Sequence, residues 1–350
     1  MKTFLVVFII SLVGPTLRAQ VFPGAEWQVA DDPADYGYSL AGLKKAEEYA
    51  NGLNTAAAIV VVDGVIIYEW GEVNTKYLAH SVRKSMASIL FGNYVEKGLI
   101  DVDKTLGEIG IDDVPKLTER EKTATIRDCL KARSCVYHDC ILREGSKAKG
   151  PPDLKLPPGT HFLYNNWDFN VLGTILEQSA GKDIFQVLEE DIAQPIRMES
   201  FTAADGWKMT GDASIHASYP LKITARDLAR FGVLMLNKGN WNGKQVVPAE
   251  WVEECTTYHS DATRSFNDGY GYMWWVAKKN NKYPHYPNVE VPLGSYSARG
   301  RGGHHMLVVP SYDLVIVHRV DTFKEGNAVS KEDFGSLVKM IFDAKLPANE

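Results

Sequence analysis

The sequence contains few cysteines and lacks a long apolar run, and each of these shortages excludes a class of protein. Only four of the 350 residues are cysteine, at Cys129, Cys135, Cys140 and Cys255. So few cysteines in so long a chain exclude a disulfide-dense scaffold, although a bridge between Cys135 and Cys140 stays open as an alternative. Beyond residues 4–13 no segment is apolar enough to span a bilayer, so no membrane anchor is expected in the rest of the chain.

An excess of positive charge is also missing. Lys and Arg number 38 against 44 Asp and Glu, which gives a formal net charge of -6, and there is no long charge block or internal repeat. Nucleic acids and anionic membranes attract basic surfaces, so neither is expected as a partner. The 45% of hydrophobic residues is ample for a large core, in one domain or two.

The first residues have the pattern of an export signal. Lys2 supplies the positive start, residues 4–13 are apolar, and Ala19 is a small residue at a suitable cleavage point. A membrane anchor is the alternative, but the apolar run is shorter than the roughly 20 residues of a spanning helix. We therefore expect a signal peptide over residues 1–19, a mature chain that begins near Gln20, and a secreted or periplasmic protein.

Strand patterns occur at both ends of the mature chain. Two β-branched runs, 56–62 and 65–70, flank Asp63-Gly64 and predict a β-hairpin. Later strands are expected at 271–278, 304–310 and 314–320. Helical patterns occur at 40–53, 125–132, 170–179, 183–193, 225–236 and 330–344. We expect one α+β domain over residues 20–350, whose helical subregion covers roughly 100–220 and whose sheet is built from both chain ends.

The pair Ser81 and Lys84 is the first candidate for chemistry. It opens a helical pattern, and residues three apart on a helix lie on one face. A hydroxyl becomes a strong nucleophile when a neighbouring amine, with its pKa lowered by burial, accepts its proton. The helix N-terminus would also direct backbone N–H groups at a developing negative charge. A solvated helix start without catalytic function can contain the same two residues. A catalytic interpretation therefore requires further matching residues elsewhere in the chain.

A second candidate stretch, 157–170, is dense in polar and aromatic side chains. Tyr164 would serve as a proton shuttle whose pKa a nearby lysine cation lowers. Asn166 would orient Lys84 or bind a substrate carbonyl, because an amide both donates and accepts hydrogen bonds. A turn followed by a capped helix, with the aromatic rings as packing, is the alternative.

These two stretches together resemble the Ser-x-x-Lys and Tyr-x-Asn motifs of the class C β-lactamase and penicillin-binding-protein-like serine hydrolases. Ser81 with Lys84 and Tyr164 with Asn166 match the motifs in order and at a suitable separation. The resemblance runs from about Leu53 to the last helix. It implies a β-lactamase/transpeptidase-like α+β fold, an antiparallel sheet flanked by helices, and an active site where the sheet meets the helical region.

The third motif of that family, Lys-Thr-Gly or a His or Trp variant, is not present. Counting back from Pro310 places Ala298, Arg299 and Gly300 at its position, in a stretch similar to the glycine-rich strand of the esterase and amidase branch. Glycine would let a substrate backbone approach the strand, and a plain turn is the alternative. Arg299 or Arg301 could restore the missing charge. On a regular strand, however, both would lie opposite Ala298.

Three histidines are weaker candidates. His138 lies in the loop that this family places near its pocket, where contact with substrate and simple surface exposure are both open. His304 and His305 have no accompanying ligand spacing, so we expect strand histidines and no metal site.

The resemblance implies acyl transfer without a cofactor. Ser81 would attack an ester or amide carbonyl of a small molecule or peptide, and Lys84 with Tyr164 would move the proton. The substrate-binding candidates are Asn166, Arg299, Gly300, Arg301 and His138. Loss of the motif lysine favours an ester or amide over a β-lactam. A β-lactamase or D-Ala-type carboxypeptidase, and a non-catalytic ligand-binding homologue of the cell envelope, are the two alternatives.

Overall fold

The computed structural model describes residues 20–142, 155–262, 268–278 and 285–347. The expected signal peptide, residues 1–19, therefore lies outside the described residues. None of the helices in the described ranges has both the length and the apolar composition that crossing a membrane requires.

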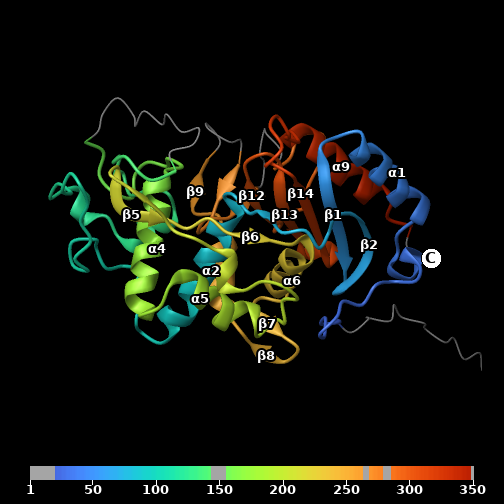
Figure 1. Cartoon of the computed structure of the whole chain (residues 1–350), viewed down its shortest axis with the longest axis horizontal. Coiled ribbons are helices and arrows are strands. Elements are labelled where there is room, and N and C mark those ends of the chain that lie inside the picture. The colour runs from blue at the N-terminus through green and yellow to red at the C-terminus, as the bar shows by residue number, and fades with distance from the viewer. Residues whose placement is uncertain (1–19, 143–154, 263–267, 279–284, 348–350) are drawn as a thin grey trace, which may run out of the picture.

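An eight-stranded antiparallel sheet combines strands from the N-terminal and C-terminal parts of the described chain (Figure 1). Its strands, in spatial order, are β2 (Val65–Gly71), β1 (Thr55–Val62), β14 (Leu314–Val320), β13 (His304–Val309), β12 (Tyr296–Gly300), β11 (Trp275–Val276), β10 (Gly269–Tyr270) and β9 (Ser260–Asp261). The β1 and β14 strands pair in register, with Ala58 opposite His318. The expectation of an α+β fold whose sheet is built from both chain ends is confirmed.

Helices cover both faces of this sheet. On one face lie α1 (Leu40–Asn51) and α9 (Lys331–Asp343), and on the other lie α2 (Val82–Glu96) and α6 (Ala225–Leu236) (Figure 1). Alternate strand residues supply the two cores, so Val60 packs in the α1 and α9 core and Ile59 in the α2 and α6 core. Because both faces are buried, these strands read as continuous apolar runs in the sequence.

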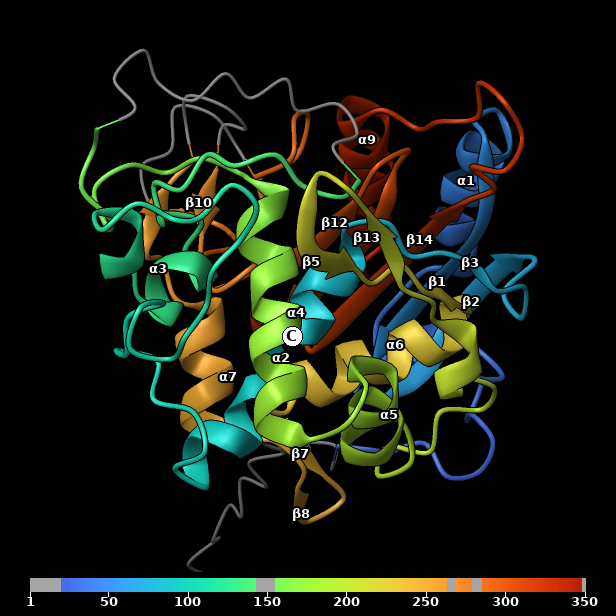
Figure 2. The same ribbon diagram turned by 60° about the vertical axis from the view of Figure 1, so that its left-hand side comes forward.

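The middle of the chain forms the helical region beside α2 (Figure 2). It contains α3 (Ile126–Leu130), α4 (Asn166–Ala180), α5 (Ile184–Leu188) and a π-helical turn, η3 (Glu189–Ala193). The short 3-10 helices are η1 (Pro33–Tyr36), η2 (Glu121–Thr123), η4 (Ala203–Asp205) and η5 (Pro310–Tyr312). The remaining elements are β3 (Tyr77–Leu78), β4 (Met209–Gly211), β5 (Ser214–Ser218), β6 (Lys222–Ile223), β7 (Asn240–Trp241), β8 (Lys244–Gln245) and α7 (Ala249–Thr256).

Three local expectations differ from the structure. Helix α4 begins at Asn166, four residues earlier than expected, because the Asn165 side chain caps it by accepting from the Trp167 N–H. The expected strand 271–278 is interrupted by a turn in which Met273 has φ 61°, which leaves only the two-residue β11. The glycine-rich stretch 297–310 is a hairpin of β12 and β13, not one strand.

Candidate active site

Ser81 lies at the N-terminal end of α2, in a tight turn between β3 and the helix. The preceding residue, His80, has φ 48°, a conformation that is strained for a residue other than glycine. Two contacts hold it there. The His80 carbonyl accepts from Arg83 Nη1 at 2.9 Å, and the His80 Nε2 lies 2.8 Å from Thr322 Oγ1. The turn therefore presents Ser81 on a braced backbone.

The Lys84 amine joins the two candidate motifs. Its Nζ lies within hydrogen-bond distance of the Ser81 Oγ, at 3.2 Å, and of the Tyr164 hydroxyl, at 2.9 Å. A third bond goes to the Asn166 Oδ1 at 2.5 Å. Lys84 is buried, with 2% of its surface exposed, whereas the other three residues are only partly buried. The structure thus brings the Ser-x-x-Lys and Tyr-x-Asn residues into one group with a solvent-facing side, and we name Ser81, Lys84, Tyr164 and Asn166 the front cluster.

The first turn of α4 fixes the orientation of the Asn166 amide. Its Nδ2 donates to the Leu142 carbonyl at 2.6 Å, which leaves Oδ1 to accept from Lys84. The neighbouring Asn165 caps the helix and donates to the Val136 carbonyl at 2.7 Å. Because the loop after α3 and the start of α4 are tied together in this way, the Asn166 amide contacts the lysine through Oδ1 and the loop through Nδ2.

Burial controls the proton affinity of both groups that could move a proton. It lowers the pKa of Lys84 well below its usual value, and the positive charge of Arg83 lowers that pKa further. Burial also raises the pKa of Tyr164 to about 12, although the Ser81 hydrogen bond and the Arg83 charge act in the opposite direction. The rise in the Tyr164 pKa is opposite to the sequence-based expectation, because the effect of burial outweighs those of the Ser81 hydrogen bond and the Arg83 charge. Burial therefore favours the neutral amine of Lys84 and the protonated phenol of Tyr164.

Two other serines on α2 have structural roles. The Ser85 hydroxyl donates to the Met273 carbonyl at 2.6 Å, and the Ser88 hydroxyl donates to the Ser85 carbonyl at 2.9 Å. The side chains of Ser85 and Ser88 are both buried. Ser81 is thus the only one of the three hydroxyl groups that contacts Lys84 among the described residues.

Strand β12 lies directly against the turn formed by Ala79, His80 and Ser81. We name this turn the nucleophile turn, because it holds the candidate nucleophile Ser81. A side chain at Gly300 would place its Cβ 2.7 Å from the Ala79 carbonyl and 3.1 Å from the His80 Cβ. Glycine is therefore needed because the strand approaches the protein's own backbone, whereas the sequence suggested room for a substrate backbone. Ala298 pairs with Met306 and is buried in the α2 and α6 core.

The two candidate arginines lie in different places. Arg299 pairs with His305 on the α9 side of the sheet, where its Nη1 lies 2.6 Å from the buried Asp268 Oδ2. Its guanidinium also covers the Tyr286 ring, at 4.4 Å from the centroid. Arg301 is exposed in the turn after β12, so the expected strand alternation does not apply to it. The structure therefore places Arg299 on the α9 side of the sheet and Arg301 in the exposed turn between β12 and β13.

His138 contacts residues outside the front cluster. Its Nε2 is 3.4 Å from the Glu121 carboxylate and its ring packs 5.9 Å from the Trp167 ring. The described ranges contain no group of three or more His, Cys, Asp or Glu side chains arranged to hold a metal ion. All four cysteines are free thiols in buried positions, so Cys135 and Cys140 are not bridged.

Several supporting residues could not be identified from the sequence. His80 and Thr322 brace the nucleophile turn from positions far apart in the chain. Asp268 and His285 meet beneath β12, with 2.8 Å between Oδ1 and Nδ1. No spacing rule connects such pairs. The one available signal was the position of His80 directly before the candidate nucleophile.

Comparison with known protein families shows to which family this chain belongs. The Beta-lactamase family model matches residues 43–334. The chain belongs to this family. Members of the Beta-lactamase family are serine hydrolases, with acyltransferase homologues, so this chain is a β-lactamase-related serine hydrolase with the β-lactamase/transpeptidase-like fold.

Individual relatives of this Beta-lactamase family member are distant. An uncharacterized protein of Alkalihalophilus pseudofirmus is 22% identical over 316 residues, which cover 80% of this chain and 88% of that protein. Monacolin J acid methylbutanoyltransferase of Aspergillus terreus is 26% identical over 161 residues, 37% of this chain and 38% of that enzyme.

A solved structure of a putative 6-aminohexanoate-dimer hydrolase from Bacillus anthracis superposes with a TM-score of 0.63 at 21% identity. The superposition covers 94% of this chain and 89% of that one. At this identity the likeness is one of fold.

Proposed function

We propose that this protein hydrolyses an ester or linear amide through an acyl-enzyme on Ser81. Neutral Lys84 accepts the Ser81 proton as the hydroxyl attacks the carbonyl carbon. Tyr164 passes a proton to the leaving group and is reprotonated from Lys84. Water then attacks the acyl-enzyme by the reverse route, which releases the acid and restores Ser81.

The observation that carries this proposal is the set of contacts made by the Lys84 amine. It touches the Ser81 Oγ and the Tyr164 hydroxyl together, at 3.2 and 2.9 Å. Among the described residues it forms no ion pair with a carboxylate, and burial lowers its pKa. A buried amine without a counter-ion is a base, whereas one paired with a carboxylate would stay a cation.

The start of α2 supports the stabilisation of the oxyanion. The Ser81 N–H lies at the helix N-terminus and makes no hydrogen bond to any described residue. The second donor would be the backbone N–H after Gly300, because β12 lies against the nucleophile turn there. One such donor contributes about 3 kcal/mol to the transition state.

A preference for esters or linear amides over β-lactams rests on β12. Ala298 stands at the position of the missing lysine and carries no charge. Arg299 points to the far side of the sheet and pairs with Asp268. The loss of a charge-assisted hydrogen bond to a β-lactam carboxylate costs about ten- to a hundredfold in binding. The name of the Aspergillus terreus relative, a methylbutanoyltransferase, describes the transfer of an open-chain acyl group.

The test compares kcat/KM for nitrocefin and for p-nitrophenyl butyrate on one preparation of enzyme. We expect the ester to be the better substrate, and Ser81→Ala to abolish its turnover with the fold intact by circular dichroism. Intact mass after a fluorophosphonate should show one added group, absent in Ser81→Ala. Nitrocefin turnover at or above the ester rate, lost in Arg301→Ala, would assign the lysine's role to that arginine and overturn the substrate preference.

We also propose export, on the sequence pattern of residues 1–19 alone. The mature protein should begin near Gln20. N-terminal sequencing of the protein from culture medium or periplasm tests this. A retained Met1 in the membrane fraction would contradict it.

A further inference from the structure

Arg83, which lies between Ser81 and Lys84 in the chain, is a buried residue of α2. Only 5% of its surface is exposed. Its Nη1 donates to the His80 carbonyl at 2.9 Å, and its Nη2 donates to the Ser218 Oγ at 3.1 Å. One guanidinium thus connects the nucleophile turn to the last residue of β5. The planar, forked shape of the guanidinium suits two acceptors at once.

The segment on the far side of Arg83 is itself fixed to α4. The Arg83 Cζ lies 5.1 Å from the centroid of the Tyr219 ring. The Tyr219 hydroxyl donates to the Phe169 carbonyl at 3.0 Å, and the Phe169 ring lies 4.9 Å from the Tyr164 ring. Arg83 therefore connects the nucleophile turn with the helix that follows Tyr164.

The guanidinium is also a positive charge beside the front cluster. Among the described residues, the charged or titratable side chains that contact Lys84 or act on its charge are Arg83 on α2, Tyr164 before α4 and Cys140 in the loop after α3. Burial is the main cause of the lowered Lys84 pKa. Arg83 lowers this pKa further, and Cys140 acts in the opposite direction. The Arg83 charge therefore favours the neutral amine.

We propose that Arg83 is a positioning residue with two effects on the acyl transfer at Ser81. Its hydrogen bond to the His80 carbonyl holds the nucleophile turn in the conformation in which Ser81 contacts Lys84. Its charge opposes protonation of the Lys84 amine, so the base stays available at lower pH. This inference rests on the proposed function, in which neutral Lys84 accepts the Ser81 proton.

The charge effect is tested with the pH profile of kcat/KM for p-nitrophenyl butyrate. The reference is the wild-type midpoint, the pH at which the wild-type value is half of its plateau. Arg83→Gln removes the charge and keeps an amide donor, so Lys84 should become protonated at higher pH. We expect the fraction of the plateau that this variant retains at the wild-type midpoint to be about three- to fivefold smaller. An unchanged midpoint would overturn the proposal.

The hydrogen-bond effect is tested with Arg83→Lys, which keeps the charge but lacks the planar fork. Rates are normalised to the concentration of Ser81 that a fluorophosphonate labels, so a loss of folded enzyme does not lower them. Arg83→Lys should retain the wild-type midpoint, and its normalised plateau should fall about tenfold, because a small displacement of a catalytic group is costly. A normalised plateau equal to that of wild type would overturn the proposal.

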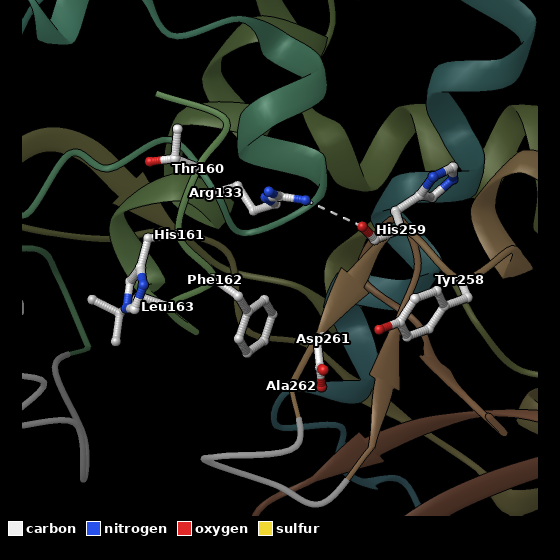
Figure 3. A pocket seen from close by; sticks show the side chains of 9 residues that line it. All are labelled: Arg133, Thr160, His161, Phe162, Leu163, Tyr258, His259, Asp261 and Ala262. Atoms are coloured by element: carbon white, nitrogen blue, oxygen red, sulfur yellow. Dashed lines mark hydrogen bonds between the residues drawn. The ribbon is translucent and has the colours of Figure 1, made fainter. Parts of the chain in front are cut away.

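Arg133→Gln is the matched control. Arg133 lines a pocket of about 560 Å³, shown in Figure 3, where its Nη1 donates to the His259 carbonyl at 3.3 Å. It is likewise a partly buried arginine bonded to a backbone carbonyl, but among the described residues it forms no hydrogen bond to the front cluster. Its midpoint and normalised plateau should equal those of wild type. The same midpoint shift as in Arg83→Gln would overturn the proposal.

A variant at Ser218 tests the geometry with Arg83 left in place. Ser218→Ala removes one acceptor of the guanidinium and no charge. It should retain the wild-type midpoint and reduce the normalised plateau about two- to fivefold. A midpoint that moves as in Arg83→Gln would contradict the assignment of the shift to the charge, and so overturn the proposal.

Ser81→Ala separates this inference from the proposed function. Turnover or labelling that persists in Ser81→Ala would reject the proposed function. Turnover that depends on Ser81, with a wild-type pH profile in Arg83→Gln, would retain the proposed function and reject the role of Arg83.

Discussion

Two clusters of polar side chains lie on opposite sides of β12 and differ in one respect, the presence of a carboxylate. The front cluster has the Lys84 amine with hydroxyl and amide partners only. The cluster behind the strand, which we name the rear cluster, consists of Asp268, His285, Arg299 and Lys331. Its carboxylate lies 2.6 Å from the Arg299 guanidinium and 3.5 Å from the Lys331 amine.

The counter-ion decides which charges persist in each cluster. Burial alone would raise the pKa of Asp268, but Arg299 and His285 outweigh it, so this pKa falls below its usual range. Asp268 and Arg299 therefore remain ionised at neutral pH. In the front cluster no carboxylate of the described residues pairs with Lys84, and burial lowers its pKa well below the usual value. Burial thus favours a neutral amine where the counter-ion is missing, whereas the buried charges of the rear cluster form a structural tie.

The largest expected effect comes from removing the uncompensated base. Lys84→Met should reduce kcat/KM for p-nitrophenyl butyrate by about 10⁴-fold or more, since members of a catalytic group act as a unit. The unfolding free energy should fall by only about 1–3 kcal/mol, the cost of leaving the Asn166 acceptor without a partner. Urea titration beside the kinetics checks this. A variant that retains a tenth of the activity would exclude Lys84 as the base.

The rear cluster should show the opposite pattern. Asp268→Asn leaves Arg299 buried without its counter-ion, and breaking a buried pair costs about 3–5 kcal/mol of stability. Asp343→Asn is the matched control, because its partner Lys339 is exposed and such pairs contribute about 0–1 kcal/mol. The midpoint of urea unfolding distinguishes them. Equal small losses in both variants would show that the rear cluster is not a structural tie.

The two clusters should also respond differently to pH. Burial lowers the pKa of His285 to about 4 and of His318 to about 4, both below the unfolded value near 6.5. The unfolded chain then binds more protons between about pH 4 and 6.5, so the contribution of these two histidines to stability is complete above pH 6.5. It should fall by about 1.4 kcal/mol per pH unit for each histidine as the pH drops toward 4.

Activity should follow Lys84 instead. The kcat/KM value should rise with pH and level off at a pKa well below 10.5, because only the neutral amine accepts the proton. Unfolding free energy and activity are measured on the same samples between pH 4 and 10. His285→Gln should reduce by one the number of protons taken up on unfolding between pH 4 and 6.5, and so reduce the slope of the unfolding free energy against pH. An unchanged slope would contradict the assignment of His285.

The smallest expected effect concerns the glycine between the clusters. Gly300→Ala places a methyl group 2.7 Å from the Ala79 carbonyl, so the nucleophile turn must shift by a fraction of an ångström. We expect about a tenfold loss of kcat/KM, since a small displacement of a catalytic group is costly. Ala298→Gly on the same strand is the control. Full activity in Gly300→Ala would mean that β12 does not position Ser81.

Much of the fold could be predicted from the sequence because its signals are local. The Asp63-Gly64 hairpin and helices α1, α6 and α9 follow directly from turn chemistry and periodicity. The interruption before β11 could not be predicted, since a positive φ at Met273 comes from tertiary contacts rather than from residue preference.

The residues of the candidate site could likewise be predicted only where the signal is local in the sequence. Ser81 with Lys84, and Tyr164 with Asn166, were recognisable because each pair lies within one helical turn or one short loop. The position of Arg299 depends on the partner Asp268, which lies on a different segment. The pocket lined by Arg133, Phe162 and Asp261 likewise joins segments that only the folded chain brings together.

The order of the strands has a consequence for biosynthesis. The nucleophile turn is translated early, yet it is completed by β12 and by Thr322, and β1 pairs with β14 from the end of the chain. A nascent chain that has not reached β13 and β14 lacks the centre of its sheet, so the contacts that hold the turn at Ser81 cannot all form before the last strands emerge. Pairings over such long sequence separations also form slowly. Chain topology therefore delays completion of the turn that carries Ser81 until synthesis is nearly finished.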